Sequence, residues 1–239
     1  MHDGTIGENL KRVQERIAAA ALRAGRRAEE ITVIGVSKTH PASAIREAYD
    51  AGLRHFGENR VQEWEGKCGT LGGLQATWHL IGHLQSNKAA RAAKLFHCID
   101  SLDDANLAER LNRTRAEAAG ESVNRAKLRV LIEVQLGDEE SKSGVSEAKL
   151  PALAEKILGL EQLQLAGLMC IPPYFANTDD VRPFFARLRN MRDTLEAQLS
   201  RPLQVLSMGM SHDFEAAILE GSTEVRVGTA LFGIREAAA

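Results

Sequence analysis

A single lysine stands where a short apolar run of the sequence ends. Lys38 follows the stretch 33–36 and Ser37, and it precedes Thr39 and His40. An apolar run of this kind is typical of a fully buried strand, and burying an unpaired ammonium group costs much free energy. Lys38 is therefore either a solvated residue at a strand end or an amine held in place for chemistry, such as imine formation with a carbonyl compound.

Two segments near the C-terminus have the residues of a phosphate site. The first, SMGMSHDFEAAILEG, passes from a predicted strand to a predicted helix through Gly209, with Ser207 and Ser211 nearby. Helix N-termini offer unpaired N–H groups and the positive end of a dipole. The second, VRVGT, places Gly228 where the backbone can approach a ligand and adds the Thr229 hydroxyl. Singly, Ser211 could only cap a helix and Gly228 could only serve packing, but together these residues favour a phosphorylated ligand.

A strand-end lysine beside a phosphate site is typical of two kinds of ligand. One is a phosphosugar aldehyde or ketone, as in a Schiff-base aldolase, and the other is pyridoxal 5′-phosphate. An aldolase needs further acid–base residues, whereas pyridoxal phosphate needs a partner for its pyridine nitrogen. Arg226 alternates with Val225 and Val227, so it faces the same side as Gly228 and could reach that nitrogen.

The elements that must position these residues alternate between strands and helices. An amphipathic helix is predicted at 6–25, and helical periodicity returns between the later apolar runs. Such alternation predicts a parallel sheet, and eight units in 239 residues predict one (β/α)8 barrel domain, 1–239, with an extra N-terminal helix. An open doubly wound sheet is the alternative. The predicted strands are 31–37, 54–57, 77–82, 96–100, 128–136, 163–170, 203–208 and 224–232.

The C-terminal ends of barrel strands are where such folds place their active sites. Polar residues occupy most of these ends, among them Lys38, Asn59 and Arg226. The barrel therefore brings Lys38 to the same face as the predicted phosphate site, which favours chemistry over a solvated lysine.

Composition excludes several classes of partner. The formal net charge is −2, and no basic run is interleaved with aromatic residues, so we expect no nucleic-acid partner. No apolar stretch approaches the length of a membrane span, and the N-terminus lacks the apolar segment of a signal peptide. Cys68, Cys98 and Cys170 are odd in number and widely spaced, as expected of buried thiols in the cytoplasm.

Several segments together resemble the pyridoxal phosphate homeostasis protein family, which is related to the N-terminal barrel of alanine racemase. They are VSKTHP, HFGENRVQE, WHLIGHLQSNK, SKSGV, GLMCIPP and LSMGMSHDFEAAILEGSTEVRVGTALFG, and the resemblance runs from about residue 6 to about residue 235. It implies a (β/α)8 barrel that carries pyridoxal phosphate on Lys38 and serves in storage and delivery of the cofactor without established turnover. It also implies roles for Asn59 beside the cofactor, Arg226 at the pyridine nitrogen, and Ser207, Ser211, Gly228 and Thr229 around the phosphate.

This chain departs from the family at His40, at Arg60 and in its EAAA C-terminus, which leaves any secondary site at His40 or in the loop at Lys142 open. Apo-enzymes that receive the cofactor are possible partners, and we expect a monomer. The alternative function is an amino-acid racemase, which would need a second acid–base group, and Tyr174 in the IPPY loop is the candidate.

Other polar residues have simpler interpretations. His79 and His83 are four residues apart, but they lie on a predicted strand and its exit, without a third ligand at the usual spacing, so we expect no metal. Glu133 and Gln135 are expected to form polar bonds inside the barrel.

Overall fold

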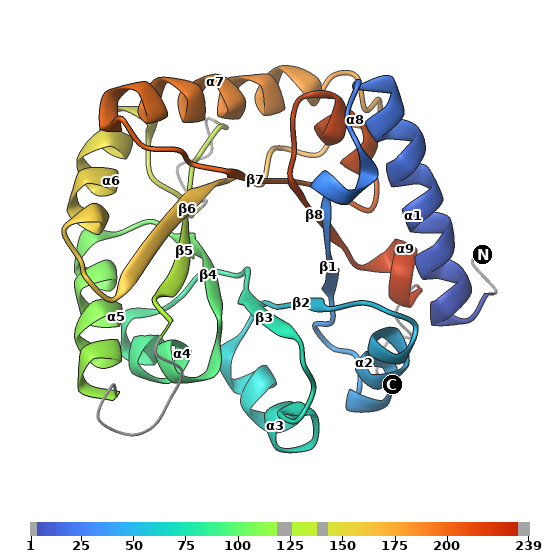
Figure 1. Ribbon diagram of the computed structural model, residues 1–239, viewed down its shortest axis with the longest axis horizontal. Coiled ribbons are helices and arrows are strands. Elements are labelled where there is room, and N and C mark those ends of the chain that lie inside the picture. Colours follow the sequence, from blue (N-terminus) through green and yellow to red (C-terminus); the bar gives the residue numbers. More distant parts are fainter. Residues whose placement is uncertain (1–3, 119–125, 138–142, 234–239) are drawn as a thin grey trace.

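The computed structural model describes residues 4–118, 126–137 and 143–233. Eight parallel strands form a closed barrel in which β1 to β8 follow one another around the ring (Figure 1). The ring closes because β1 pairs with β8 as well as with β2, in a register that sets Ile34 beside Arg226. The predicted (β/α)8 barrel is therefore confirmed, and the open doubly wound sheet is wrong.

The eight strands coincide with the eight predicted apolar runs, with ends that differ by a few residues. Their bounds are β1 Thr32–Val36, β2 His55–Glu58, β3 Thr77–Leu80, β4 Cys98–Leu102, β5 Leu128–Glu133, β6 Leu163–Met169, β7 Val205–Met210 and β8 Glu224–Val227.

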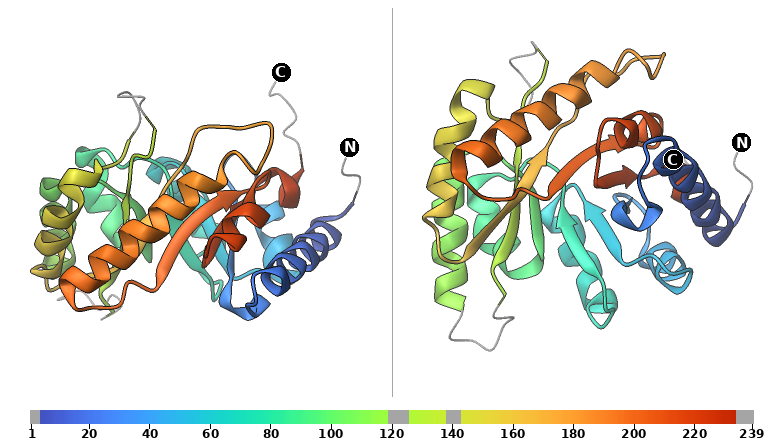
Figure 2. Two further views of the ribbon diagram at one scale, coloured as in Figure 1. Left: turned by 90° about the horizontal axis from the view of Figure 1, so that it is seen from above. Right: turned by 45° about the horizontal axis from the view of Figure 1, so that its top comes forward.

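Helices surround the barrel on its outside, as the end-on and side views show (Figures 1 and 2). The α-helices are α1 Ile6–Arg23, α2 Ala42–Asp50, α3 Val61–Leu71, α4 Ala89–Leu95, α5 Ala105–Ala118, α6 Leu150–Leu158, α7 Arg182–Leu199, α8 Phe214–Leu219 and α9 Thr229–Phe232, and the short 3₁₀ turns are η1 Ala28–Glu30, η2 Ser86–Lys88 and η3 Glu147–Lys149. Among the helices described here, none is both long and apolar enough to cross a membrane.

The extra N-terminal helix α1 is confirmed. It starts at a capping box in which Thr5 and Glu8 each bond the other's backbone N–H. Its buried face, which includes Leu10, Val13 and Ile17, packs against α8, α9 and α2. This helix therefore covers the side of the barrel where the first and last strands meet.

The last predicted strand is too long. β8 ends at Val227, and Thr229–Phe232 forms the short helix α9 instead. Across the barrel edge, the Ser211 hydroxyl oxygen accepts hydrogen bonds from the N–H groups of Gly228 at 3.1 Å and Ala230 at 3.3 Å. These bonds take the chain out of the strand, although the residues 229–232 are apolar enough to continue it.

Aromatic packing shows which side chains of β2 and β3 face the surrounding helices. Trp78 on β3 stacks on Trp64 of α3 with ring centroids 3.8 Å apart, and Phe56 on β2 stacks on Trp78 at 5.1 Å. Phe56 and Trp78 therefore face the helices. Because side chains alternate along a strand, His55 and His79 point into the barrel.

Candidate functional site

A cavity of about 490 Å³ opens at the C-terminal ends of the strands. It contains six of the seven predicted site residues, which come from the loop after β1, the end of β2, the turn after β7, and β8 with its exit. We call it the strand-end cavity, and its lining residues are Val36, Lys38, His40, Asn59, Ile81, Gly82, His83, Glu133, Ser143, Ile171, Met210, Ser211, His212, Arg226, Gly228 and Thr229.

Lys38 is half-buried in the turn that follows β1. Its neighbour Ser37 is fully buried and still belongs to the ladder, since its N–H donates to the Gly57 carbonyl at 3.0 Å. The next residue, Thr39, has a φ of 65°, in the left-handed region that residues other than glycine seldom adopt. Lys38 is therefore presented from a turn whose backbone is constrained on both sides.

Arg226 lies on β8 and is only 3% exposed, yet it lines the cavity. Its guanidinium donates to the Ser207 carbonyl at 2.8 Å, to the Ser207 hydroxyl at 2.8 Å and to the Cys170 carbonyl at 2.7 Å. These neutral acceptors fix the guanidinium without neutralising its charge, so the cavity keeps a cation on this wall.

Ser207 is the one predicted site residue that does not line the cavity. It is fully buried on β7, and its hydroxyl and carbonyl both accept from Arg226. The structure therefore places it behind Arg226, where it orients the guanidinium.

The predicted phosphate corner lies where the β7 exit meets the β8 exit. The Ser211 oxygen accepts from two N–H groups, those of Gly228 and Ala230, so both of its lone pairs are used and its own O–H remains to donate into the cavity. Gly209 makes this turn possible, because its φ is 92° and an added Cβ would lie 2.6 Å from the Ala217 Cβ. Thr229 adds an exposed hydroxyl beside Ser211.

Asn59 reaches the cavity because β2 and β3 approach closely at their ends. A Cβ added at Gly82 would lie 2.4 Å from the Asn59 carbonyl oxygen. The glycine in the sequence LIGHL is thus needed to seat Asn59 at the cavity wall.

Glu133 is a cavity residue that sequence reasoning assigned to the barrel interior. It ends β5, is 6% exposed, and faces the same cavity as Arg226. Burial raises the pKa of Glu133 to about 7, the nearby Asp103 carboxylate adds to the rise, and Arg226 opposes it. A lone carboxyl ending an apolar strand was the signal that could have placed it here.

The other candidate residues lie at the rim of the cavity or outside the described residues. Tyr174 is 79% exposed, and its ring centroid lies 5.2 Å from that of His212, which lines the cavity. His40 lines the cavity and stacks on Phe232 at 4.9 Å. Lys142 lies outside the described residues.

His79 and His83 do not act together. His83 is exposed, and its Nδ1 lies 3.6 Å from an Asp103 oxygen. His79 is buried on β3, two residues before the cavity residue Ile81, so both side chains point to the same side of the chain. His79 belongs to a second polar cluster inside the barrel, which we call the interior network. Its members are His55, His79, Cys98, Asp100, Arg129 and Glu224.

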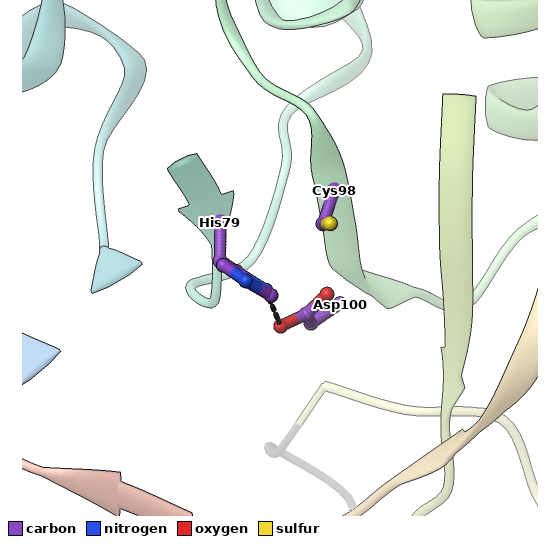
Figure 3. A group of neighbouring side chains, drawn as sticks. All are labelled: His79, Cys98 and Asp100. Carbon is purple, nitrogen blue, oxygen red and sulfur yellow. Dashed lines mark hydrogen bonds and ion pairs between the residues drawn. The ribbon is translucent and has the colours of Figure 1, made fainter. Parts of the chain in front are cut away.

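Three members of the interior network have the donor atoms of a metal site. Figure 3 shows His79 on β3 pointing toward Asp100 on β4, with Cys98 on the same strand, and their ligand atoms lie within 4.8 Å of one another. Both ring nitrogens of His79 are already engaged, Nδ1 with Asp100 at 2.8 Å and Nε2 with His55 Nδ1 at 3.0 Å. The Arg129 guanidinium also contacts the Cys98 sulfur at 3.7 Å. A cation beside the sulfur and a fully bonded imidazole disfavour a metal.

Electrostatics in this network follow from the same contacts. Burial lowers the pKa of His79, but the attraction of Asp100 and of Cys98 outweighs it, and the net direction is well above the ordinary value. Burial lowers the pKa of His55 to about 4, and the positive charges of His79 and Arg129 act in the same direction. His79 is therefore the protonated ring: its Nδ1–H donates to Asp100, and its Nε2–H donates to Nδ1 of the neutral His55.

Comparison with known proteins shows the family of this chain. Residues 8–236 match the family model of the alanine racemase N-terminal domain. Two curated relatives named pyridoxal phosphate homeostasis protein come from Aquifex aeolicus, 47% identical over 96% of this chain and 98% of that protein, and from Pseudomonas aeruginosa, 46% identical over 97% and 96%.

Solved structures of similar proteins also have this fold. PipY of Synechococcus elongatus, solved with pyridoxal phosphate bound, matches with a TM-score of 0.80 and 42% identity over 92% of this chain and 100% of PipY. An alanine racemase of Clostridium difficile, 17% identical with a TM-score of 0.70 over 98% of this chain and 57% of its own length, shares the fold. The chain belongs to the pyridoxal phosphate homeostasis protein family, within the wider family of the alanine racemase N-terminal domain.

Proposed function

We propose that this protein binds pyridoxal 5′-phosphate as an imine on Lys38 and serves intracellular homeostasis of the cofactor by storing and delivering it. The observation that carries the proposal is the convergence of Lys38, Arg226 and the Ser211 corner on one cavity. PipY, a relative with the same barrel, has been solved with the same cofactor bound.

The residues of the cavity fit the cofactor group by group. The Lys38 amine would add to the aldehyde carbon, both amine hydrogens would leave with the aldehyde oxygen as water, and a C=N bond would replace the C=O bond. Ser211 and Thr229 offer hydroxyl groups to the phosphate, and Asn59 offers an amide beside the ring. A cavity of about 490 Å³ is in the size range of cofactor sites.

A carrier fits these residues better than an enzyme does. Bound pyridoxal phosphate supplies an electron sink whose strength depends on protonation of its ring nitrogen. Arg226 is always a cation, and a cation facing that nitrogen keeps it unprotonated and the sink weak. The second acid–base group of a racemase would be Tyr174, which is 79% exposed and is not among the residues that line the cavity.

The state of the cysteines supports a cellular compartment for this carrier. All three cysteines, Cys68, Cys98 and Cys170, are free, as expected in the reducing cytoplasm. We infer a cytoplasmic, monomeric carrier, with apo-enzymes that need the cofactor as its recipients.

The imine is tested by the visible absorption spectrum of protein purified without added cofactor. We expect yellow protein, and reduction with borohydride should attach the cofactor to Lys38, as located by mass spectrometry. Lys38→Ala should lose the imine band and still bind the cofactor measurably through the phosphate corner. A protein that stays colourless with added pyridoxal phosphate would contradict the proposal.

The absence of turnover is tested by deuterium exchange at the α-carbon of alanine and serine in heavy water. We expect negligible exchange with the loaded protein. Exchange at about 1 per second or faster, a rate typical of enzymes, and its loss in Tyr174→Phe would identify a racemase-type enzyme instead.

A further inference from the structure

Outside the barrel wall, behind the turn that carries Lys38, lies a small buried cluster of charged residues. Lys67 on α3 lies between Glu58 at the end of β2 and Glu63 in the first turn of α3. We propose that Lys67, through Glu63 and Glu58, is a positioning residue that holds the Lys38 turn in the conformation that forms the imine. The inference rests on the proposed function, because it concerns the same lysine.

The Lys67 ammonium group is fully used. Its nitrogen donates to the Ser37 carbonyl at 3.1 Å, to Glu58 Oε1 at 3.0 Å and to Glu63 Oε1 at 3.0 Å. An ammonium group has three N–H donors, so each has an acceptor. Lys67 is thus tied at once to β1, β2 and the start of α3.

The two residues on either side of Lys38 are held by the same cluster. Ser37 donates its hydroxyl to Glu58 Oε1 at 2.8 Å, and its carbonyl accepts from Lys67 and from the His40 N–H at 3.1 Å. Thr39 donates its backbone N–H to Glu63 Oε1. The backbone is therefore clamped immediately before and immediately after Lys38.

The clamp holds Thr39 in a backbone conformation that it would otherwise leave. A β-branched residue at a φ of 65° is strained, and the hydrogen bond from its N–H to Glu63 is made in that conformation. Without the clamp, the backbone of Thr39 can relax to the right-handed region. That change in the turn would redirect the side chain of Lys38.

The cluster lies behind the cavity and does not line it. Lys67, Glu63 and Glu58 are absent from the cavity lining, whereas Lys38 is part of it. Glu58 and Ser37 are fully buried, and Lys67 is 13% exposed. Burial raises the pKa of Glu58, while Lys67 and then Ser37 oppose the rise, so Lys67 is what stabilises a carboxylate at this depth. These residues act on the cofactor only through the backbone of Lys38.

The test compares two ligands that differ at the reacting carbon. Pyridoxal 5′-phosphate can form the imine, whereas pyridoxine 5′-phosphate, which has an alcohol in place of the aldehyde, cannot. In Lys67→Met we expect the dissociation constant of pyridoxal phosphate to rise about tenfold or more, with a weaker imine band. We expect the dissociation constant of pyridoxine phosphate to stay within about twofold of the wild-type value. The residues of the phosphate corner line the cavity and make none of the contacts of Lys67.

Two sets of variants control for folding. Lys156→Met removes a lysine that also pairs with a glutamate, Glu109, but on the surface between α5 and α6, and it should change neither constant. If Lys67→Met fails to fold, Glu63→Ala and Glu63→Gln replace it, because Glu63 is nearer the surface. Glu63→Ala should repeat the loss, whereas Glu63→Gln keeps an oxygen acceptor and should recover most of the imine.

The outcomes separate this inference from the proposed function. An imine in the wild type with unchanged binding in Lys67→Met or Glu63→Ala overturns the positioning role alone. Equal losses for both phosphate esters also overturn it, since they would show general damage to the cavity. A wild type that binds pyridoxal phosphate without an imine contradicts the proposed function itself.

Discussion

Two buried polar regions lie inside the described part of the barrel, and they are built in opposite ways. The cavity is at the C-terminal ends of the strands, and the interior network lies nearer their N-terminal ends. In the interior network, His79 bonds a partner at each ring nitrogen, and Arg129 bonds both Glu224 and Cys98. In the strand-end cavity, Arg226 is held by uncharged acceptors and the Ser211 hydroxyl keeps its own hydrogen to donate. Apart from the buried Asp100 Oδ1 and Glu224 Oε2, which lack a hydrogen-bond partner among the described residues, the groups of the interior network are paired with one another and stabilise the fold. Groups held by neutral backbone and hydroxyl acceptors, as Arg226 is, remain available to bind a ligand.

Charge balance shows the same difference. The interior network pairs His79 with Asp100 and Arg129 with Glu224, so opposite charges meet inside it. The cavity contains the Arg226 cation and the Glu133 carboxyl, whose pKa burial raises to about 7, so that near pH 7 it carries only part of a negative charge. A net positive cavity suits a phosphate ester, and a neutral network suits a core.

The largest expected loss of stability comes from a substitution that breaks the interior network. Asp100→Asn should lower the free energy of unfolding by about 3–5 kcal/mol, because it leaves the His79 charge buried without its partner. The pKa of His79 is raised in the folded state, so its contribution is fully present below pH 6.5 and is lost as the pH rises through the higher folded value. Urea denaturation at several pH values checks both points.

The control for this prediction is Asp50→Asn, which changes an exposed aspartate at the end of α2. It should leave the free energy of unfolding within about 0.5 kcal/mol of the wild type. Pyridoxal phosphate binding by folded Asp100→Asn should be unchanged, and a loss of binding larger than the loss of stability would show that the two regions are not independent.

A smaller effect is expected at Glu133. Its folded pKa of about 7 exceeds the ordinary 4.5, so the stability it contributes is present below pH 4.5 and is lost as the pH rises through 7. Without ligand, Glu133→Gln should therefore be more stable than the wild type at about pH 8, by about 1–3 kcal/mol, and the gain should shrink toward acid pH. Glu117→Gln, at an exposed position on α5, should show no such gain.

The phosphate corner should give an effect of about one hydrogen bond. Ser211→Ala should weaken binding of pyridoxal phosphate by about 0.5–1.5 kcal/mol, measured by titration of the imine band. Binding of pyridoxal, which lacks the phosphate, should be unaffected by the same substitution. Equal affinity of the wild type for pyridoxal and for its phosphate would show that the corner does not bind the phosphate.

The smallest effect is expected at Tyr174. Because its ring is 79% exposed and contacts His212 at the rim, Tyr174→Phe should change the dissociation constant of pyridoxal phosphate by less than about twofold. A much larger loss, measured in the same titration, would place its hydroxyl group in the site and would revive the racemase alternative.

The fold could be predicted because its signal is local. Apolar runs such as 128–136 alternate with helical periodicity, and eight of them allow few topologies. The end of β8 could not be predicted, because it depends on Ser211, seventeen residues earlier, bonding Gly228 across the barrel edge. Local preference alone continues the strand through Phe232.

The sequence predicted which residues reach the cavity where residue type and strand position agree, as at Lys38 and Arg226. Ser207 does not line the cavity, because its hydroxyl and carbonyl both accept from Arg226 on the neighbouring strand, a contact that no short motif encodes. Lys67 gave no signal, since a lysine on an amphipathic helix usually faces solvent. The interior network also needs contacts between different strands, such as His55 with His79, that no short motif encodes.

The pairing of β1 with β8 has a consequence for synthesis of the chain. Lys38 leaves the ribosome early, whereas Arg226 follows it by 188 residues (226 − 38) and reaches the cavity only when β8 docks beside β1. A chain truncated before Glu224 would present the lysine without the arginine and with two open strand edges, at β1 and β7. The proposed site is therefore complete only after translation has passed the last strand and the barrel has closed.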